Sequence, residues 1–213
     1  QEEVEKITTD QLQPGTSYST SIFYSQRSTI KNFDEFKYFT GVTKIKTYTF
    51  YGLGNMESIS LPDTVTEMAG YSFVSCTRLN KLRIPKNINI QNGAVNDGRV
   101  TELHMESLND WIELPEHEFA RNLNIAGVWN LYINGEKIEH LVLESVPSSS
   151  VRGFGYKMGI KSITISSSIA QTGQMWFQEC TNLTHIYGCS GVTSIQNVYT
   201  IFSGCSNIEY VDS

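Results

Sequence analysis

The most constraining feature of this sequence is a seven-position pattern that occurs twice with a shift of 23 residues. Its two copies comprise Phe50, Leu53, Met56, Ile59, Leu61, Pro62 and Val65, and then Phe73, Cys76, Leu79, Leu82, Ile84, Pro85 and Ile88. Agreement at seven positions in one register is improbable by chance, and a period of about 20–29 residues is typical of stacked repeats. The pattern therefore predicts a repeat protein instead of a closed globule.

Each copy contains the core L-x-x-L-x-L that is typical of a leucine-rich repeat. The core reads Met56-x-x-Ile59-x-Leu61 in one copy and Leu79-x-x-Leu82-x-Ile84 in the next. Alternation directs the last two apolar side chains of each core to one face of a short strand, which a single unit cannot enclose. We therefore expect an α/β repeat solenoid, a right-handed horseshoe of short parallel strands with turns and few short helices.

The same core recurs along the rest of the chain with one long interruption. Val100-x-x-Leu103-x-Met105 is followed by Ile138-x-x-Leu141-x-Leu143, 38 residues later. Further units are expected around Phe154, with Ile160, Ile163 and Ile165; around Phe177, with Cys180, Leu183 and Ile186; and around Phe202, with Cys205, Ile208 and Val211. In the unit of Phe154, Lys157 stands in the position that Cys76 fills. The last unit ends on an expected strand, so either the native protein continues or this open edge makes an end-to-end contact.

The interruption predicts an insert at about residues 106–137. Ser107-Leu-Asn-Asp110 has the spacing of a capping box, which predicts a helical turn. Asn134-Gly135 between apolar runs predicts a hairpin that leads into the next strand of the stack at 138–143. Because the insert carries Trp111 and Trp129, it is one candidate contact region.

Residues 1–30 are expected to form a cap or linker, and residues 31–213 the solenoid. Thr8 or Thr9 is a candidate N-cap of a helical turn that ends at Pro14-Gly15, and 16–30 reads as one or two exposed strands. The spacing from Asn32 to Glu35 predicts a short helix that acts as an apolar lid on the stack. A degenerate first strand is the competing interpretation.

The charge of the chain disfavours two classes of partner. Sixteen basic against 22 acidic residues give a net charge of −6, which leaves no excess of cations for nucleic acid or an anionic lipid surface. Only 18% of residues are charged, a composition closer to secreted proteins. No stretch approaches the roughly 20 apolar residues of a membrane span, so no direct membrane insertion is expected here. Any export signal or lipid anchor is expected upstream of Gln1.

Three segments resemble the BspA-like leucine-rich repeats of bacterial surface proteins. They are Phe73-x-x-Cys76-x-x-Leu79-x-x-Leu82-x-Ile84-Pro85, Glu35-Phe-Lys-Tyr-Phe-Thr-Gly41 and Leu131-Tyr-Ile-Asn-Gly-Glu136. The resemblance covers roughly residues 30–213. It implies an extracellular or cell-surface binding module of a host-associated bacterium, and some members of this family are adhesins for host matrix proteins.

The four cysteines are expected to be packing residues. Cys76, Cys180 and Cys205 share one repeat position that Leu53 fills in the first copy, and a position that accepts leucine is apolar. Cys180 and Cys205 would lie on adjacent coils, where a disulfide is geometrically conceivable. Cys189 lies off the pattern.

No motif in the sequence predicts an enzyme, a cofactor or a metal site. Glu116-His117-Glu118-Phe-Ala-Arg121 places Arg121 where the zinc-binding helix H-E-x-x-H requires histidine. The pairs Gly52/Gly54 and Gly153/Gly155 lack the third glycine of a dinucleotide loop and are expected to form turns.

Alternation along the strands predicts which side chains face outward and could bind a ligand. Ser58 and Ser60 begin these outward rows, His104 and His140 are expected diagonally across neighbouring strands, and Val142, Ser162 and Asp212 complete the rows. The predicted binding face comprises Lys81, Arg83, Glu102, His104, His140, Thr164, His185, Tyr187 and Tyr210. This mixture of aromatic and charged side chains suits a protein or glycan ligand. The alternative functions are a targeting appendage of a secreted degradative enzyme and a structural spacer.

Overall fold

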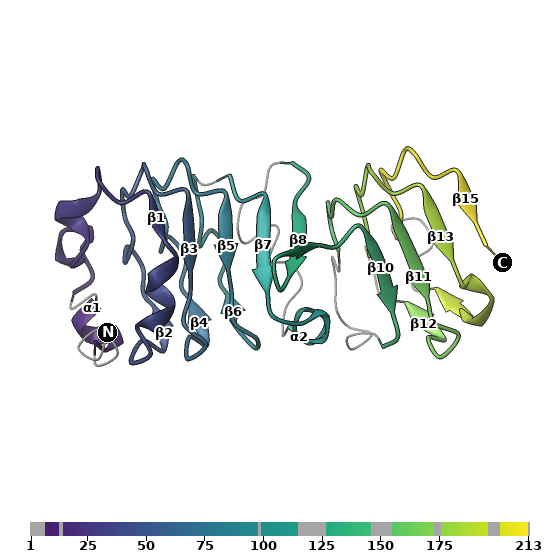
Figure 1. Ribbon diagram of the computed structural model, residues 1–213, viewed down its shortest axis with the longest axis horizontal. Helices are drawn as coiled ribbons and strands as arrows, with labels where there is room; N and C mark the ends of the chain where they lie inside the picture. The colour runs from purple at the N-terminus through teal and green to yellow at the C-terminus, as the bar shows by residue number, and fades with distance from the viewer. Residues whose placement is uncertain are drawn as a thin grey trace.

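The computed structural model describes residues 7–12, 15–97, 99–114, 127–145, 155–172, 176–195 and 201–212. The chain winds into an elongated stack of coils, with its N- and C-termini at opposite ends (Figure 1). Within those ranges no helix is long and apolar enough to cross a bilayer. The stack of coils confirms the predicted solenoid of short parallel strands.

One side of the solenoid is formed by two sheets in which neighbouring strands are parallel, except for one hairpin. The six-stranded sheet contains, in spatial order, β1 (Asn32–Phe33), β3 (Ser58–Ser60), β5 (Lys81–Arg83), β7 (Glu102–Met105), β8 (Asn130–Ile133) and β9 (Glu136–Lys137). The four-stranded sheet contains β10 (His140–Leu143), β11 (Ser162–Ile165), β13 (His185–Tyr187) and β15 (Tyr210–Val211). We call the outer surface of these two sheets the sheet face. The register aligns Ile59, Leu82 and Leu103, as the repeat predicts.

A second series of short strands forms another side of the coils. It comprises a three-stranded sheet of β2 (Lys44–Ile45), β4 (Glu67–Met68) and β6 (Asn89–Ile90), and a pair of β12 (Gln171–Thr172) and β14 (Ser194–Ile195). Ile45 and Met68 are fully buried, so each strand of the three contributes one side chain to the interior. The L-x-x-L-x-L core does not reach these residues, and we did not predict the strands.

The interior is one continuous apolar cluster. Ile59, Leu61, Leu82 and Ile163 are fully buried within it. Phe50 and Phe73 stack in neighbouring coils with ring centroids 4.8 Å apart, and Phe177 and Phe202 stack at 6.2 Å. The repeated phenylalanines thus form a column of two stacked pairs, one in the N-terminal part and one in the C-terminal part of the solenoid.

The predicted alignment of residues 154–160 is wrong by about one residue. The thiol of Cys180 donates to the carbonyl of Gly155, just as the thiol of Cys76 donates to the carbonyl of Phe50, both at 3.0 Å. Gly155 therefore occupies the phenylalanine position, and the buried Met158 replaces Lys157 in the cysteine position. The ring of Phe177 fills the space above Gly155, where an added methyl group would lie 2.6 Å from Phe177 Cδ1. Phe154 lies outside the described residues.

Both elements predicted for the insert are present. Helix α2 (Leu108–Ile112) begins after Ser107, whose Oγ accepts from the amide of Asp110 at 3.0 Å. Asn134 (φ 51°) and Gly135 (φ 85°) have the left-handed backbone of a tight hairpin turn between the antiparallel β8 and β9.

The place of the hairpin in the stack differs from the prediction. Its first strand, β8, pairs in parallel with β7 and is itself the next strand of the sheet. The segment expected there, 138–143, instead begins the second sheet with β10. Trp111 and Trp129 are fully buried, so the insert does not offer them as a contact region.

Trp129 connects the two halves where the sheet is interrupted. Its backbone forms an isolated parallel bridge with Met158. Its amide donates to the carbonyl of Lys157 at 3.1 Å, and its indole Nε1 donates to the carbonyl of Tyr156 at 2.6 Å. The stack therefore stays continuous through this side of the coils.

The N-terminal segment is only partly as predicted. Helix α1 (Thr9–Leu12) follows Thr8, and the amide of Thr8 donates to Gln11 Oε1 at 2.9 Å. Residues 16–30 contain no strand; they form two 3-10 turns, η2 (Tyr18–Thr20) and η3 (Tyr24–Gln26). Serine and threonine side chains in this segment bond to nearby backbone, which favours turns over an extended chain.

Residues 32–39 combine the two competing interpretations. Asn32–Phe33 pairs with β3 as a short first strand, and the 3-10 helix η4 (Asp34–Tyr38) follows directly. The predicted capping box is absent, because Asn32 Oδ1 accepts from the amide of Asp34 without acting as N-cap. The buried Phe36 closes this end of the core together with Phe23, which stacks on Phe50 at 5.6 Å.

Candidate functional site

The strand register places the predicted binding residues in rows on the sheet face. In the six-stranded sheet, Lys81 pairs with Glu102, and Arg83 pairs with His104. In the four-stranded sheet one row runs through His140, Ser162, His185 and Tyr210, and the next runs through Val142, Thr164 and Tyr187. The nine residues thus lie in two groups separated by the interruption of the sheet, and their role in binding stays a prediction.

The N-terminal end of the sheet face is covered, which corrects the expectation that Ser58 and Ser60 are exposed. Both serines occupy outward positions, but η4 packs over β3. Ser60 is 8% exposed, and its Oγ lies 3.1 Å from Asp34 Oδ1. The accessible part of the face therefore begins at β5.

Arg83 is held by neighbouring groups and is less available to a ligand than predicted. Its Nη2 lies 2.6 Å from carboxylate oxygens of both Asp63 and Glu106, and its Nη1 donates to the carbonyl of Leu61. Its side chain is only 15% exposed. A hollow of about 350 Å³ beside it is lined by Lys37, Tyr38, Ser60, Asp63, Arg83 and Glu106. Because two carboxylates neutralise the guanidinium, Arg83 is better placed to shape this hollow than to bind an anion.

His104 stacks on an aromatic neighbour that the sequence analysis missed. Its ring lies parallel to that of Tyr132 on β8, with centroids 4.4 Å apart and an interplanar angle of 8°. Burial lowers the pKa of His104, although Glu102 Oε2 lies 3.2 Å from Nε2 and acts in the opposite direction. Tyr132 was missed because β8 was not recognised as a strand of the sheet. For the same reason the predicted placement of His104 and His140 diagonally across neighbouring strands is wrong, since β7 and β10 belong to different sheets.

The most exposed aromatic group of the sheet face lies near the C-terminal edge. Three rings, His185, Tyr187 and Tyr210, lie with all centroid pairs 5.8–5.9 Å apart. We call these three residues the aromatic patch. Tyr187 is 36% exposed and Tyr210 is 48% exposed. The exposed Val142 and the partly buried Thr164 lie in the same row as Tyr187. The alternation of inward and outward side chains along the strands was sufficient to predict that these residues share one face.

All four cysteines are free thiols. Cys76 and Cys180 are fully buried, and burial raises the pKa of Cys76 to about 12 and also raises the pKa of Cys180. The Cys205 thiol donates to the carbonyl of Phe177, which repeats the contact made by Cys76 and Cys180. The prediction that this column serves packing agrees with these contacts.

Within the described ranges, no group of three histidine, cysteine or acidic side chains is arranged to hold a metal ion. Residues 116–121, which contain the incomplete zinc motif, lie outside the described residues, as does Gly153. Gly52 has φ 72° and forms a turn between coils, as predicted.

The comparisons with known proteins identify the repeat. The family model for the BspA type leucine rich repeat region matches six copies over residues 16–126 and 130–213, and the chain therefore belongs to this family. No curated protein matches the chain.

Two solved structures resemble it. A leucine-rich repeat protein from Bacteroides ovatus is 17% identical, with a TM-score of 0.42, over 81% of this chain and 46% of that one. A leucine-rich repeat protein from Eubacterium ventriosum is 13% identical, with a TM-score of 0.30, over 93% of this chain and 77% of that one. The chain thus spans about half the length of the Bacteroides ovatus protein.

Proposed function

We propose that this chain is a non-catalytic binding module of a bacterial surface or secreted protein, and that it binds a host or matrix protein through the sheet face. Membership of the BspA type repeat family supports a repeat module for protein binding and an exported location. The observation that carries the choice of face is the aromatic patch, three rings held next to one another on the neighbouring strands β13 and β15.

The chemistry of the sheet face suits a protein ligand. Tyrosine is enriched at protein interfaces because its ring supplies apolar contact area while its hydroxyl stays hydrogen-bonded. Short paired strands fix the backbone beneath the rings, so little conformational entropy is lost on binding. Val142, 46% exposed in the row that leads to Tyr187, adds apolar area.

A glycan ligand is the second candidate for the same face. Glu102 and Lys81 pair across neighbouring strands beside the rings of His104 and Tyr132, and their charged groups can bond to the hydroxyl groups of a sugar. As a targeting appendage or spacer of a larger secreted enzyme, the chain would use the same surfaces. That role would depend on the other domains of the native protein.

The experiment is binding of the purified chain to an array of extracellular-matrix proteins and oligosaccharides. We expect selective binding to proteins, weakened at least about tenfold in the variant Tyr187→Ser/Tyr210→Ser, because aromatic residues dominate such interfaces. Tyr38→Ser is the matched control, since Tyr38 is about as exposed as Tyr187 but lies on η4, outside the aromatic patch. Equal binding by the double variant and the wild type would refute the assignment of the face.

A further inference from the structure

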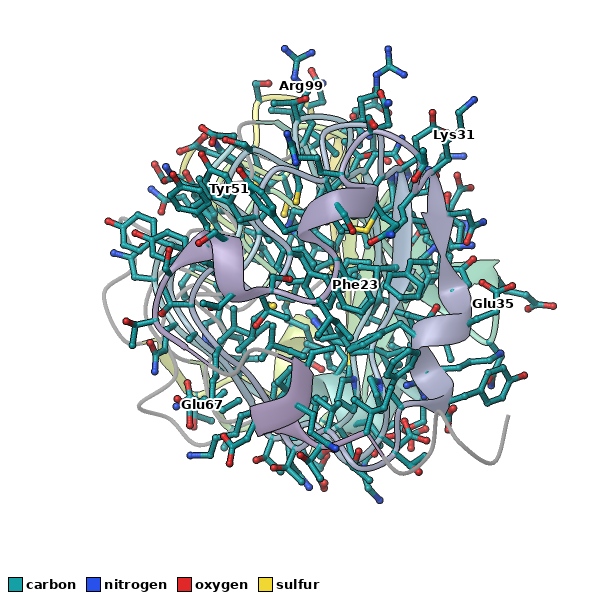
Figure 2. All side chains as sticks on the ribbon, turned by 90° about the vertical axis from the view of Figure 1, so that its left-hand side faces the viewer. Phe23, Lys31, Glu35, Tyr51, Glu67 and Arg99 are labelled. Atoms are coloured by element: carbon teal, nitrogen blue, oxygen red, sulfur yellow. The ribbon has the colours of Figure 1, made fainter. Side chains whose placement is uncertain are left out.

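A second aromatic surface lies on the side of the solenoid away from the sheet face. It consists of five tyrosines and one arginine, which we call the tyrosine surface: Tyr18, Tyr24, Tyr48, Tyr51, Tyr71 and Arg27. In Figure 2, which views the N-terminal end, Tyr51 projects on the side opposite Glu35, a residue of η4 on the sheet side. Tyr18 and Tyr71 are 43% and 52% exposed.

Four of the five tyrosine rings of this surface are held in contact with one another. Tyr18 stacks on Tyr51 with centroids 4.6 Å apart, and Tyr24 and Tyr48 flank this pair at 5.7 and 6.0 Å. Tyr48 also donates its amide to the carbonyl of Tyr71 in the next coil at 3.2 Å. The side chains are therefore arranged before any partner arrives, which lowers the entropic cost of binding.

The backbone beneath two of these tyrosines is strained. Tyr48 and Tyr71 have φ of 65° and 61°, a region that favours glycine. The next coil holds Gly93 at the equivalent position, with φ 70°, and its carbonyl accepts from the amide of Tyr71. Tyrosine is therefore kept at a glycine position in two coils despite a local cost in stability. Six other described non-glycine residues also have positive φ, so the turns of this solenoid accept side chains in the left-handed region.

The surface has the charge opposite to that of the chain as a whole. Of its six residues only Arg27 is charged, in a chain of net charge −6; Lys31, by contrast, lies on the same side as Glu35 (Figure 2). The Arg27 guanidinium lies 4.5 Å from the centre of the Tyr24 ring, and its Nη1 donates to the carbonyl of Tyr24. No described carboxylate pairs with Arg27, which has further N–H donors. This arrangement complements a partner that carries carboxylates.

The composition of the segment favours a protein partner over a sugar. Four exposed serines, at positions 17, 19, 25 and 28, lie near Tyr18 and Tyr24 in the sequence. Tyrosine with serine is the combination that antibodies use against protein surfaces, because rigid rings supply area and serines supply adaptable hydrogen bonds. Stacking of Tyr18 on Tyr51, and of Arg27 on Tyr24, covers ring faces on which a sugar would lie.

We propose that the tyrosine surface binds an aspartate- and glutamate-rich segment of a protein partner, independently of the sheet face. The rings pack against the aliphatic parts of that segment, while Arg27 and the tyrosine hydroxyls donate to its carboxylates. The chain would then hold two partners on opposite sides of one solenoid.

The test uses synthetic 15-residue peptides of net charge −5, 0 and +5, together with an oligosaccharide array. We expect the wild type to bind the acidic set alone, less tightly at about 300 mM than at 50 mM salt because the contacts are screened. Arg27→Glu should weaken binding to the acidic peptides at least about tenfold, since it replaces a charge-assisted donor with a like charge. Tyr38→Ser, on η4 and outside both surfaces, is the matched control and should bind them as the wild type does.

Tyr71→Gly separates binding from folding. Because glycine relieves the backbone at φ 61°, this variant should lose binding to the acidic peptides while its midpoint of thermal unfolding stays equal to or above that of the wild type. A midpoint below that of the wild type would show that Tyr71 serves stability, and would overturn the argument from strain. Binding without preference for acidic peptides, or binding only to oligosaccharides, would overturn the proposal. Neither result would bear on the sheet face, which Tyr187→Ser/Tyr210→Ser tests separately.

Discussion

At the scale of single residues, the repeat is held by a column of thiols beside the column of phenylalanines. The thiols of Cys76, Cys180 and Cys205 each donate, at 3.0 Å, to a backbone carbonyl of the preceding coil. Each of these carbonyls also accepts the backbone amide of the residue three positions later, so the thiol adds a second hydrogen bond inside the apolar core. The column therefore accepts leucine, as at position 53, but gains a hydrogen bond from cysteine.

Phe73→Ala tests whether the phenylalanine column is interior. Phe73 is fully buried and stacks on Phe50, so the substitution should lower the free energy of unfolding by about 3–5 kcal/mol. Denaturant titration of the variant and the wild type measures this difference. A loss within experimental error of zero would be incompatible with a packed column.

Gly155 and Gly93 form a matched pair for testing the revised register. Both have the left-handed backbone, with φ 69° and 70°, so alanine strains both positions equally. An added methyl group at Gly155 meets the ring of Phe177 at 2.6 Å, whereas at Gly93 it meets nothing within 4 Å. Gly155→Ala should therefore cost about 1–3 kcal/mol more than Gly93→Ala, by overpacking. Equal costs in thermal unfolding would place Phe177 elsewhere.

At the scale of elements, apolar alternation within the L-x-x-L-x-L core predicted strands of the sheet face. It failed at β8, which is both a strand of the stack and one half of a hairpin. Leu131 and Ile133 alternate correctly, yet the Asn134-Gly135 turn marks them first as half of a hairpin. A hairpin between β8 and β9 is compatible with the parallel pairing of β8 with β7, but sequence spacing indicates only the hairpin. The covering of Ser60 by η4 is likewise a tertiary contact that no periodicity encodes.

Strand β7 links the stability of the sheet face to pH through His104. Burial against Tyr132 lowers the pKa of His104 below 6.5, so the unfolded chain takes up this proton at a higher pH than the folded chain. Stability should therefore fall as pH falls below 6.5 and through the pKa of the folded state. His104→Gln removes the group, and its free energy of unfolding should decline less between pH 7 and pH 5 than that of the wild type. Parallel declines in both proteins would contradict this account.

At the scale of the whole molecule, continuity of the core across the interrupted sheet rests on Trp129. The indole is fully buried, and its hydrogen bond to Tyr156 joins the two halves. Trp129→Ala should cost about 3–5 kcal/mol. Because coils contact only their neighbours, it should also split unfolding into two transitions. Calorimetry of the variant measures both effects, and a single transition with an unchanged midpoint would show that the halves are joined by other contacts.

The most direct test of the central claim, a single stack in which β8 continues the sheet, is hydrogen exchange followed by mass spectrometry on peptides of the native chain. The claim predicts slow exchange that recurs at each strand from β3 to β13, including Asn130–Ile133, with faster exchange at the turns between them. Protection confined to one block of the sequence, or exchange at Asn130–Ile133 as fast as in an unfolded chain, would contradict it.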